Sequence, residues 1–161
     1  MLIGLISDTH IPDRAKEIPQ KVFDAFKDVD LILHAGDLTS LKVIDELEKV
    51  APVIAIQGNM DRINGINLPI AKVVEVEDLK IGIAHGEVYP RADTQQLVYL
   101  AKELDVDILV TGHSHQPKIE QSEGILLYRT ATASISRQVW RGQGELQHPH
   151  PALQRSWRDE P

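Results

Sequence analysis

Residues 2–10 read LIGLISDTH, an apolar run that ends abruptly in an aspartate and a histidine. A short apolar run closed by polar residues is typical of a buried strand. Asp8 and His10 lie directly after this strand, in the loop at its carboxyl end. In such a loop, residues two apart can turn toward one point, and a carboxylate with an imidazole suits a first-row divalent metal. The stretch therefore predicts a buried strand that carries a candidate metal-binding loop.

Four more apolar runs end in the same way, each just before side chains that can bind a metal. They are LILHA (31–35) before Asp37, VIAIQ (53–57) before Asn59, KIGIA (80–84) before His85, and DILVT (107–111) before His113 and His115. If each run is a strand, the oxygen and imidazole donors gather along the strand ends. Together with the first loop they are more donors than one cation needs, and they suit two. Two divalent cations roughly 3.5–4 Å apart are the usual machinery for attacking a phosphate ester.

These motifs differ in how specific they are. Alone, an Asp-x-His loop is weak evidence and is more often a loop with a capping aspartate, and Gly36-Asp37 is common in plain turns. Gly58-Asn59 is more often a left-handed turn than a ligand. The sharpest motif is GHSH at 112–115, because two imidazoles that flank one residue after a buried strand rarely belong to a core. Its alternative is a pair of polar loop residues.

The segments between the apolar runs predict helices and hairpins. The expected helices are 19–27 beginning at Pro19, 41–50 with Ser40 as N-cap, and 94–104 with Asp93 as N-cap. The expected hairpins are 72–85 with a turn at Glu77-Asp78, and 118–128 with a turn at Glu123-Gly124. The strand–helix order of the first half favours parallel pairing in an α/β fold. Two sheets stacked face to face, with helices outside, accommodate all of these elements.

The composition bounds the class of protein. A chain of 161 residues with 42% hydrophobic and 25% charged residues is expected to form one soluble domain with a proper core. The absence of cysteine excludes thiolate-bound metal and fits a reducing compartment, so we expect a cytoplasmic protein. We expect no membrane span and no signal peptide. The net charge of −7 argues against a general nucleic-acid surface, and the oligomeric state is left open.

The joint order of the motifs, D-x-H, GD, GN, HG and GHSH, resembles the calcineurin-like metallophosphoesterase superfamily over residues 1–128. The small size and the GNMD segment look most like the compact single-domain phosphodiesterases of bacteria and archaea. The resemblance implies a four-layer αββα sandwich of two stacked mixed β-sheets flanked by helices. It implies a first metal held by Asp8, His10 and His115, a second held by Asn59, His85 and His113, and Asp37 shared by both.

The resemblance also implies a reaction: hydrolysis of phosphodiester, or activated phosphomonoester, bonds by a hydroxide that bridges the two metals. The residues expected at the reacting centre are Asp37, Asn59, His85 and His113. Many larger family members carry a histidine directly after the asparagine, where this chain has Met60, which cannot transfer a proton. Met60 therefore favours small phosphodiesters or activated monoesters as substrates.

The metal and the activity itself leave alternatives open. Manganese is the expected cofactor, with two ions bound, and zinc, iron, nickel and cobalt are the alternatives. The alternative function is a non-catalytic scaffold or protein-binding module on the same fold, as in a subunit of the eukaryotic retromer coat that belongs to this family. A scaffold is free to lose ligands, whereas all seven expected ligands are present here.

Four more polar side chains lie near the motifs. His34 lies within its strand and is expected to be a core histidine or a support for a ligand. Arg14, Arg62 and Arg91 lie in loops that follow ligand segments, where they could meet a phosphate. Arginines on a solvated surface are more common, so no role is assigned to them.

The end of the chain departs from the family pattern, and residues 129–161 are expected to lie outside the domain formed by 1–128. This segment lacks the usual Asn-Pro-Gly-Ser stretch, shows no clear strand pair, and is suddenly rich in Arg, Gln, His, Pro and Trp. Translation in a shifted reading frame would produce such a change, and a divergent, disordered tail is the alternative. A continuous frame in the source gene would refute the first hypothesis. Missing strands would leave a sheet edge open. His148 and His150 are not assigned as ligands, because no strand precedes them.

Overall fold

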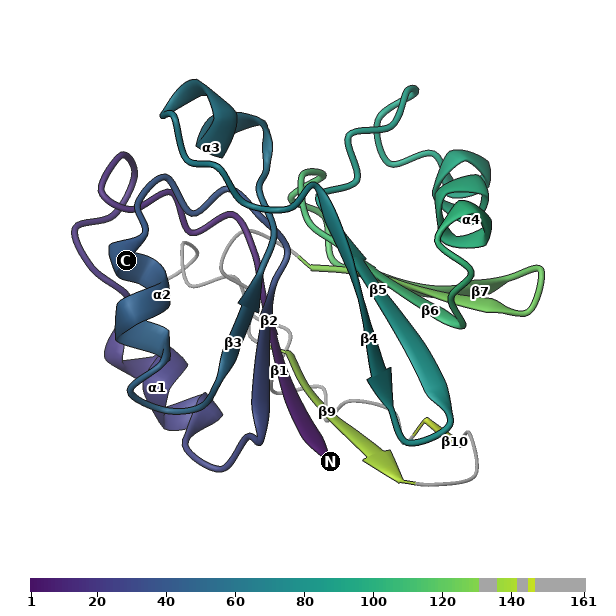
Figure 1. Ribbon diagram of the computed structural model, residues 1–161, viewed down its shortest axis with the longest axis horizontal. Helices are drawn as coiled ribbons and strands as arrows, with labels where there is room; N and C mark the ends of the chain where they lie inside the picture. Colours follow the sequence, from purple (N-terminus) through teal and green to yellow (C-terminus); the bar gives the residue numbers. More distant parts are fainter. Residues whose placement is uncertain (131–135, 142–144, 147–161) are drawn as a thin grey trace.

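In the computed structural model of the chain, which describes residues 1–130, 136–141 and 145–146, the first sheet has the order β10-β9-β1-β2-β3 (Figure 1). Its strands are β1 (Leu2–Ile6), β2 (Leu31–His34), β3 (Val53–Ala55), β9 (Ser136–Arg141) and β10 (Glu145–Leu146). The first three strands run parallel, as expected from the strand–helix order, and they are the apolar runs of the first half of the chain. Their carboxyl ends therefore meet at one edge.

The second sheet has the order β4-β5-β6-β8-β7 and is also mixed. Its strands are β4 (Ala71–Val76), β5 (Leu79–Ala84), β6 (Ile108–Thr111), β7 (Lys118–Ser122) and β8 (Ile125–Arg129). Strands β4 and β5 form one antiparallel hairpin and β7 and β8 form the other, so both expected hairpins are confirmed. The central strand β6 pairs in parallel with β5 and with β8, which places the end of β6 beside the end of β5.

Helices lie outside the two sheets and at the ends of their strands. They are α1 (Gln20–Phe26), α2 (Lys42–Leu47), α3 (Asn59–Ile63) and α4 (Thr94–Glu103). Figure 1 shows α1 and α2 on the outside of the first sheet and α4 on the outside of the second. Along β1, Ile3 and Leu5 pack into the core between the sheets, whereas Ile6 packs with α1 and α2. Since side chains alternate along a strand, each sheet contributes to two apolar layers, and the expected αββα sandwich is confirmed.

The helix ends agree with the sequence in part. Asp93 caps α4 as predicted, because its side chain accepts a hydrogen bond from the backbone N–H of Gln96 at 2.9 Å. Helix α2 is shorter than the predicted 41–50 and has Leu41 at its N-cap position. Ser40 Oγ still accepts from the N–H of Lys42 at 3.3 Å. Helix α3 was not predicted, since its five residues are too few to show a helical period.

The expectation that no clear strand pair follows residue 128 is wrong, because β9 and β10 form such a pair. Strand β8 continues to Arg129, β9 pairs antiparallel with β1, and β10 pairs with β9. Strand β9 therefore lies along the side of β1 that faces away from β2. The predicted divergence or disorder of the remaining tail, and the residues His148 and His150, lie outside the described residues.

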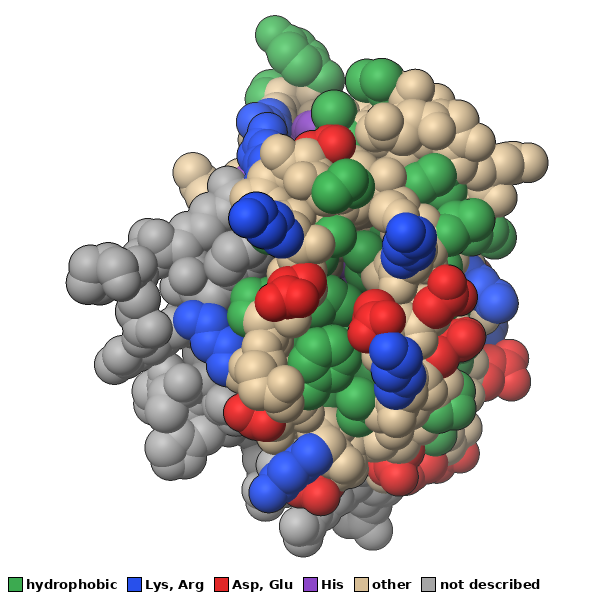
Figure 2. All heavy atoms as spheres, turned by 90° about the vertical axis from the view of Figure 1, so that its left-hand side faces the viewer, with side chains coloured by type: hydrophobic (Ala, Val, Ile, Leu, Met, Phe, Trp, Pro, Cys, Tyr) green, Lys and Arg blue, Asp and Glu red, His purple; other side chains and the backbone are tan. Residues whose placement is uncertain are grey.

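The surface of the first layer is mixed in charge. Figure 2 looks onto the side of α1 and α2, where acidic and basic side chains lie next to one another around hydrophobic ones. Between the loop that follows His10, α1 and α2 lies a cavity of about 540 Å³, lined by apolar and charged side chains of both signs. Across the described ranges, no helix is long and apolar enough to cross a bilayer.

Candidate metal centre

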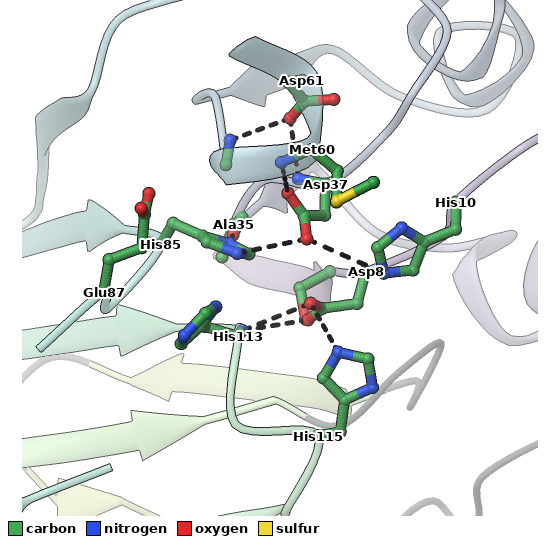
Figure 3. A network of polar contacts seen from close by, with 12 residues as sticks. Asp8, His10, Ala35, Asp37, Met60, Asp61, His85, Glu87, His113 and His115 are labelled. Carbon is green, nitrogen blue, oxygen red and sulfur yellow. Dashed lines mark hydrogen bonds and ion pairs between the residues drawn. The ribbon is translucent and has the colours of Figure 1, made fainter. Parts of the chain in front are cut away.

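The candidate ligands lie where five loops meet at the ends of both sheets. Asp8 and His10 follow β1, Asp37 follows β2, Asn59 begins α3 after β3, His85 follows β5, and His113 and His115 follow β6. Figure 3 shows that the side chains of Asp8, Asp37 and the histidines turn toward one another from these loops. Asp8, His10, Asp37 and His85 are buried, with at most 3% of each residue exposed. The parallel order of the strands therefore brings residues far apart in the sequence into one small volume.

One group of possible ligands consists of Asp8, His10 and His115. Each offers a ligand atom, and these atoms lie within 4.8 Å of one another. His115 Nε2 lies 3.3 Å from Asp8 Oδ1, and the rings of His10 and His115 stack with centroids 5.8 Å apart. These are the three residues that the family resemblance implied for a first metal.

A second group consists of Asp8, Asp37 and His85, again with ligand atoms within 4.8 Å of one another. His85 Nε2 lies 3.3 Å from Asp37 Oδ2, and His10 Nε2 lies 3.7 Å from the same oxygen. Asp8 thus belongs to both groups, while the Asp37 carboxylate lies between a histidine of each. Either carboxylate is placed to be shared between two cations.

Asn59 and His113 lie at the margin of these two groups. The side-chain oxygen of Asn59 is buried, and among the described residues it has no hydrogen-bond partner. The His113 ring is half-buried and meets the His85 ring edge to face, with centroids 5.0 Å apart. The backbone N–H of His113 donates to both oxygens of Asp8, at 3.3 and 3.2 Å. His113 therefore lies beside His85 without belonging to either group of acidic and histidine ligands. Asn59, whose amide oxygen is a further possible ligand, follows Gly58, which lies against Asp37.

The unsatisfied polar atoms test whether the site fits a metal. Within the described part of the chain, His10 Nε2, His85 Nε2 and Asn59 Oδ1 are buried and lack a hydrogen-bond partner. Buried polar atoms without partners are costly and rare in folded proteins, so several in one place call for a ligand. Imidazole nitrogen and amide oxygen both carry lone pairs that divalent cations accept. His85 Nδ1 lies 2.8 Å from the carbonyl of Ala35, which directs Nε2 into the centre.

The backbone of the loops is strained at the ligands. Left-handed φ angles occur at Asp8 (53°), His10 (48°), Asp37 (58°), His113 (61°) and His115 (57°). For residues other than glycine this conformation costs of order 1–3 kcal/mol each and tends to occur at functional sites. Because the strained residues are two apart in D-x-H and H-x-H, both side chains of each pair leave the loop toward the same centre. The sequence spacing shows this pairing, but not the strain.

Asp61 holds two of these loops together. It is fully buried, and its carboxylate accepts hydrogen bonds from the backbone N–H groups of Asp37 (2.7 Å), Thr39 (2.8 Å) and Gly58 (2.8 Å). The N–H of Met60 in turn donates to Asp37 Oδ1 at 2.9 Å. Asp61 therefore fixes the backbone on which Asp37 sits. The GNMD segment contained this residue, but nothing in its spacing showed which loop it would contact.

Gly58 is required by the close approach of the same two loops. A Cβ atom at this position would lie 2.1 Å from Asp37 Oδ1 and 2.7 Å from the Asp37 backbone nitrogen. Any side chain would therefore displace the carboxylate. The glycine of the GN motif is explained by this contact rather than by a left-handed turn, because its φ is −101°.

Burial and charge act against each other on the ionisable groups. Burial acts to raise the pKa of Asp8, but contacts with His115, His85 and Ser7 outweigh it and lower the pKa. For Asp37, burial likewise acts to raise the pKa, and His85 and the Met60 N–H lower it further than burial raises it. Both carboxylates are therefore held as anions, which is the form that binds cations.

Burial and charge also oppose each other at the histidines, and the direction of the pKa shift differs between them. Burial acts to lower the pKa of His85, but the carboxylates of Asp37 and Asp8 outweigh it and raise the pKa. Burial lowers the pKa of His10 and of His113. The two carboxylates therefore favour positive charge on the His85 ring that lies beside them.

His34 and the three arginines lie around the centre. His34 is fully buried, its pKa is lowered by burial to about 3, and its Nε2 lies 3.2 Å from Thr9 Oγ1. His34 therefore contacts the loop that carries Asp8 and His10. This agrees with the expectation that His34 supports a ligand. Arg62 forms a bidentate ion pair with Glu87, and Arg91 donates to the carbonyl of His113.

The chain matches the model of the calcineurin-like phosphoesterase superfamily domain over residues 1–137. It is 58% identical over 137 residues to a probable metallophosphoesterase of Methanothermobacter thermautotrophicus, with 85% of this chain and 80% of that protein covered. It is 48% identical over 138 residues to a probable metallophosphoesterase of Methanocaldococcus jannaschii, with 85% and 70% covered.

Among solved structures, the chain is similar to Vps29 from Entamoeba histolytica, crystallised in complex with Zn²⁺. The TM-score is 0.77 at 26% sequence identity, and the match covers 91% of this chain and 96% of Vps29. The sandwich, the ligand loops at its strand ends and these matches agree, and the chain belongs to the calcineurin-like phosphoesterase superfamily.

Proposed function

We propose that the protein hydrolyses phosphodiester, or activated phosphomonoester, bonds with two bound divalent cations. The observation that carries this proposal is the pair of overlapping ligand groups, Asp8–His10–His115 and Asp8–Asp37–His85, which share one buried carboxylate. A site that only needed a structural metal would require one such group. When bound, two cations supply a water of lowered pKa and positive charge for the phosphoryl oxygens.

The residues of the chain bind, orient and screen this centre. Asp8 and Asp37 provide the negative charge, and His10, His85 and His115 complete the two groups. We propose that Asn59 and His113, at the margin, complete the second site as expected from the family. The buried amide oxygen of Asn59, which lacks a partner among the described residues, supports that role.

The position after Asn59 bears on the substrate. Met60 uses its backbone N–H to hold Asp37 Oδ1, and its thioether cannot donate a proton to a leaving group. Substrates whose leaving group needs no proton are therefore favoured, which supports diesters of acidic alcohols and activated monoesters. No general acid is assigned.

Manganese is the proposed metal, and zinc is its first competitor. Carboxylate and amide oxygens suit Mn²⁺, whereas imidazoles suit zinc, iron and nickel as well. The zinc complex of Vps29 supports binding of that ion by the fold. The net charge of −7 supports a small substrate rather than a nucleic-acid polymer.

Metal-stripped protein is expected to hydrolyse bis-p-nitrophenyl phosphate only after a divalent cation is added. The test compares turnover with and without Mn²⁺, and with Zn²⁺ and Co²⁺, beside the His113→Ala variant. We expect activity to depend on the metal and to fall by roughly 10²-fold or more in the variant, because one side of the second site is lost. Lys49→Ala, an exposed change on the outer face, is the control.

Two outcomes would contradict the proposal. Turnover that is equal in the stripped and the reloaded protein would exclude metal-dependent chemistry. Binding of two cations without turnover of any diester or activated monoester would favour the scaffold function instead.

A further inference from the structure

A chain of buried hydroxyl groups leads from the second sheet to Asp8. Ser7 follows β1 and Thr130 follows β8, and both residues are fully buried. Ser7 Oγ lies 2.5 Å from Asp8 Oδ2 and contacts Thr130 Oγ1 directly. Thr130 Oγ1 also lies 3.1 Å from the carbonyl of Thr111. These contacts link residues that are 123 positions apart in the sequence.

The number of available hydroxyl protons determines the direction of the hydrogen bonds in this row of hydroxyl groups. It has three oxygen–oxygen contacts but only two hydroxyl protons, one on Ser7 and one on Thr130. The carbonyl of Thr111 already accepts the backbone N–H of Thr130 at 2.7 Å, so it does not need the hydroxyl proton. A carboxylate is the strongest acceptor of the set. The favoured arrangement is therefore that Thr130 donates to Ser7, and Ser7 donates to Asp8.

We propose that Ser7 and Thr130 are positioning residues that fix the orientation of the Asp8 carboxylate for metal binding. The inference rests on the proposed metal site. With Oδ2 held by Ser7, Oδ1 faces His115 Nε2 at 3.3 Å. Because Asp8 belongs to both ligand groups, its orientation affects both cations. Partners that orient a ligand typically contribute 10–100-fold to metal affinity.

Gly112 packs tightly against the contact between Ser7 and Asp8. A Cβ atom at Gly112 would lie 2.7 Å from Asp8 Oδ2 and 2.9 Å from Ser7 Oγ. We call the contacts from Thr130 through Ser7 to Asp8 the relay. The glycine of the GHSH motif is therefore needed to let the end of β6 approach this relay. The backbone N–H of the next residue, His113, donates to the same carboxylate of Asp8.

The relay also gives a role to the beginning of the segment 129–161. Thr130 lies beyond the expected domain boundary, yet its hydroxyl is two contacts away from a ligand shared by both groups. The C-terminal half of the sandwich thus supports the loop that follows the first strand. A chain that ended at residue 128 would lose this support.

The test measures Mn²⁺ binding by isothermal titration calorimetry to the metal-stripped full chain. Thr130→Val removes the hydroxyl in a side chain of the same shape and is expected to weaken binding about 10-fold, whereas Thr130→Ser keeps the hydroxyl and is expected to stay within about 2-fold of the original chain. Ser7→Ala is expected to weaken binding by about 10–100-fold. The double variant should bind no more weakly than Ser7→Ala alone, because both changes interrupt one relay.

Matched controls separate this role from a merely structural one. Thr111→Val removes a neighbouring buried hydroxyl that is not part of the relay, and it is expected to leave the affinity unchanged. Urea unfolding of each metal-free variant reports folding, and Thr130→Ala replaces Thr130→Val if the valine variant does not fold.

Each unfavourable result has its own meaning. Equal affinities of Thr130→Val and the original chain would overturn the relay and leave the metal site intact. Equal losses in Thr130→Val and Thr130→Ser would assign the effect to packing and also overturn it. An original chain that binds no Mn²⁺, Zn²⁺ or Co²⁺ would overturn the proposed function, and the relay with it.

Discussion

Replacing Asp8 by alanine is expected to abolish tight binding of both cations and to reduce diester hydrolysis roughly 10³-fold, which corresponds to about 4 kcal/mol of lost transition-state stabilisation. The reason is its place in the structure. Asp8 is the one residue that both ligand groups of the described chain contain, so its loss removes a charge from each. Removing a residue of a single group would leave the other group intact.

The measurement combines calorimetric titration of Mn²⁺ with turnover of bis-p-nitrophenyl phosphate. The original chain is expected to bind two equivalents and the Asp8→Ala variant to bind neither tightly. Asp45→Ala, which removes an exposed carboxylate on α2, is the matched control and should leave both quantities unchanged. A variant that still binds one equivalent tightly would show that Asp37, rather than Asp8, is the shared ligand.

Much of this centre could be predicted because strands and ligands share one pattern. Each apolar run is short, is closed by a polar residue, and lies in a strand–helix order that makes the pairing parallel. Those three facts suffice to bring Asp8, Asp37 and Asn59 to one edge of a sheet. Positions such as His113 depended on the second sheet, whose ends the same argument placed nearby.

The supports of the ligands could not be predicted in this way. Asp61 contacts backbone groups 22 and 24 residues away, and Thr130 contacts Ser7 across 123 residues. Such contacts depend on the exact approach of two loops, for which hydrophobic periodicity carries no information. Serine and threonine are also too common in sequences to stand out.

Strand β9 was missed for a related reason. Its sequence SRQVWR contains two apolar residues among six, which is not the alternating or continuous pattern by which strands are recognised. Backbone pairing with β1 over four residues is what places it in the sheet. Sequence patterns report side-chain burial, and they say little about a strand that is placed by backbone hydrogen bonds.

Asp61→Ala is expected to lower the free energy of unfolding of the metal-free protein by about 3–5 kcal/mol, because it leaves buried backbone N–H groups unsatisfied, each costing about 1–3 kcal/mol. Three such groups now donate to the carboxylate, from Asp37, Thr39 and Gly58. Two of the three belong to residues in left-handed conformation, Asp37 and Thr39. Without the carboxylate, their strain has no compensating contact and the loop is free to relax.

The measurement is urea unfolding with EDTA present, so that metal binding does not add to the stability of the folded state. Asp61→Asn should fall between the original chain and Asp61→Ala, since its amide keeps one acceptor oxygen but turns an N–H₂ group toward backbone donors. Asp24→Ala removes an exposed carboxylate on α1 and should change the stability by less than about 0.5 kcal/mol.

The same variants show whether Asp61 positions the ligand Asp37 or only stabilises the fold. If Asp61 positions Asp37, Asp61→Asn should lose metal affinity in larger proportion than stability, because a small shift of the loop moves the carboxylate but leaves the sandwich packed. An Asp61→Ala variant as stable as Asp24→Ala would mean that water satisfies all three donors. In that case the contacts of the ligand side chains hold the left-handed loop that carries Asp37 and Thr39. The metal centre would then determine the backbone conformation, rather than the reverse.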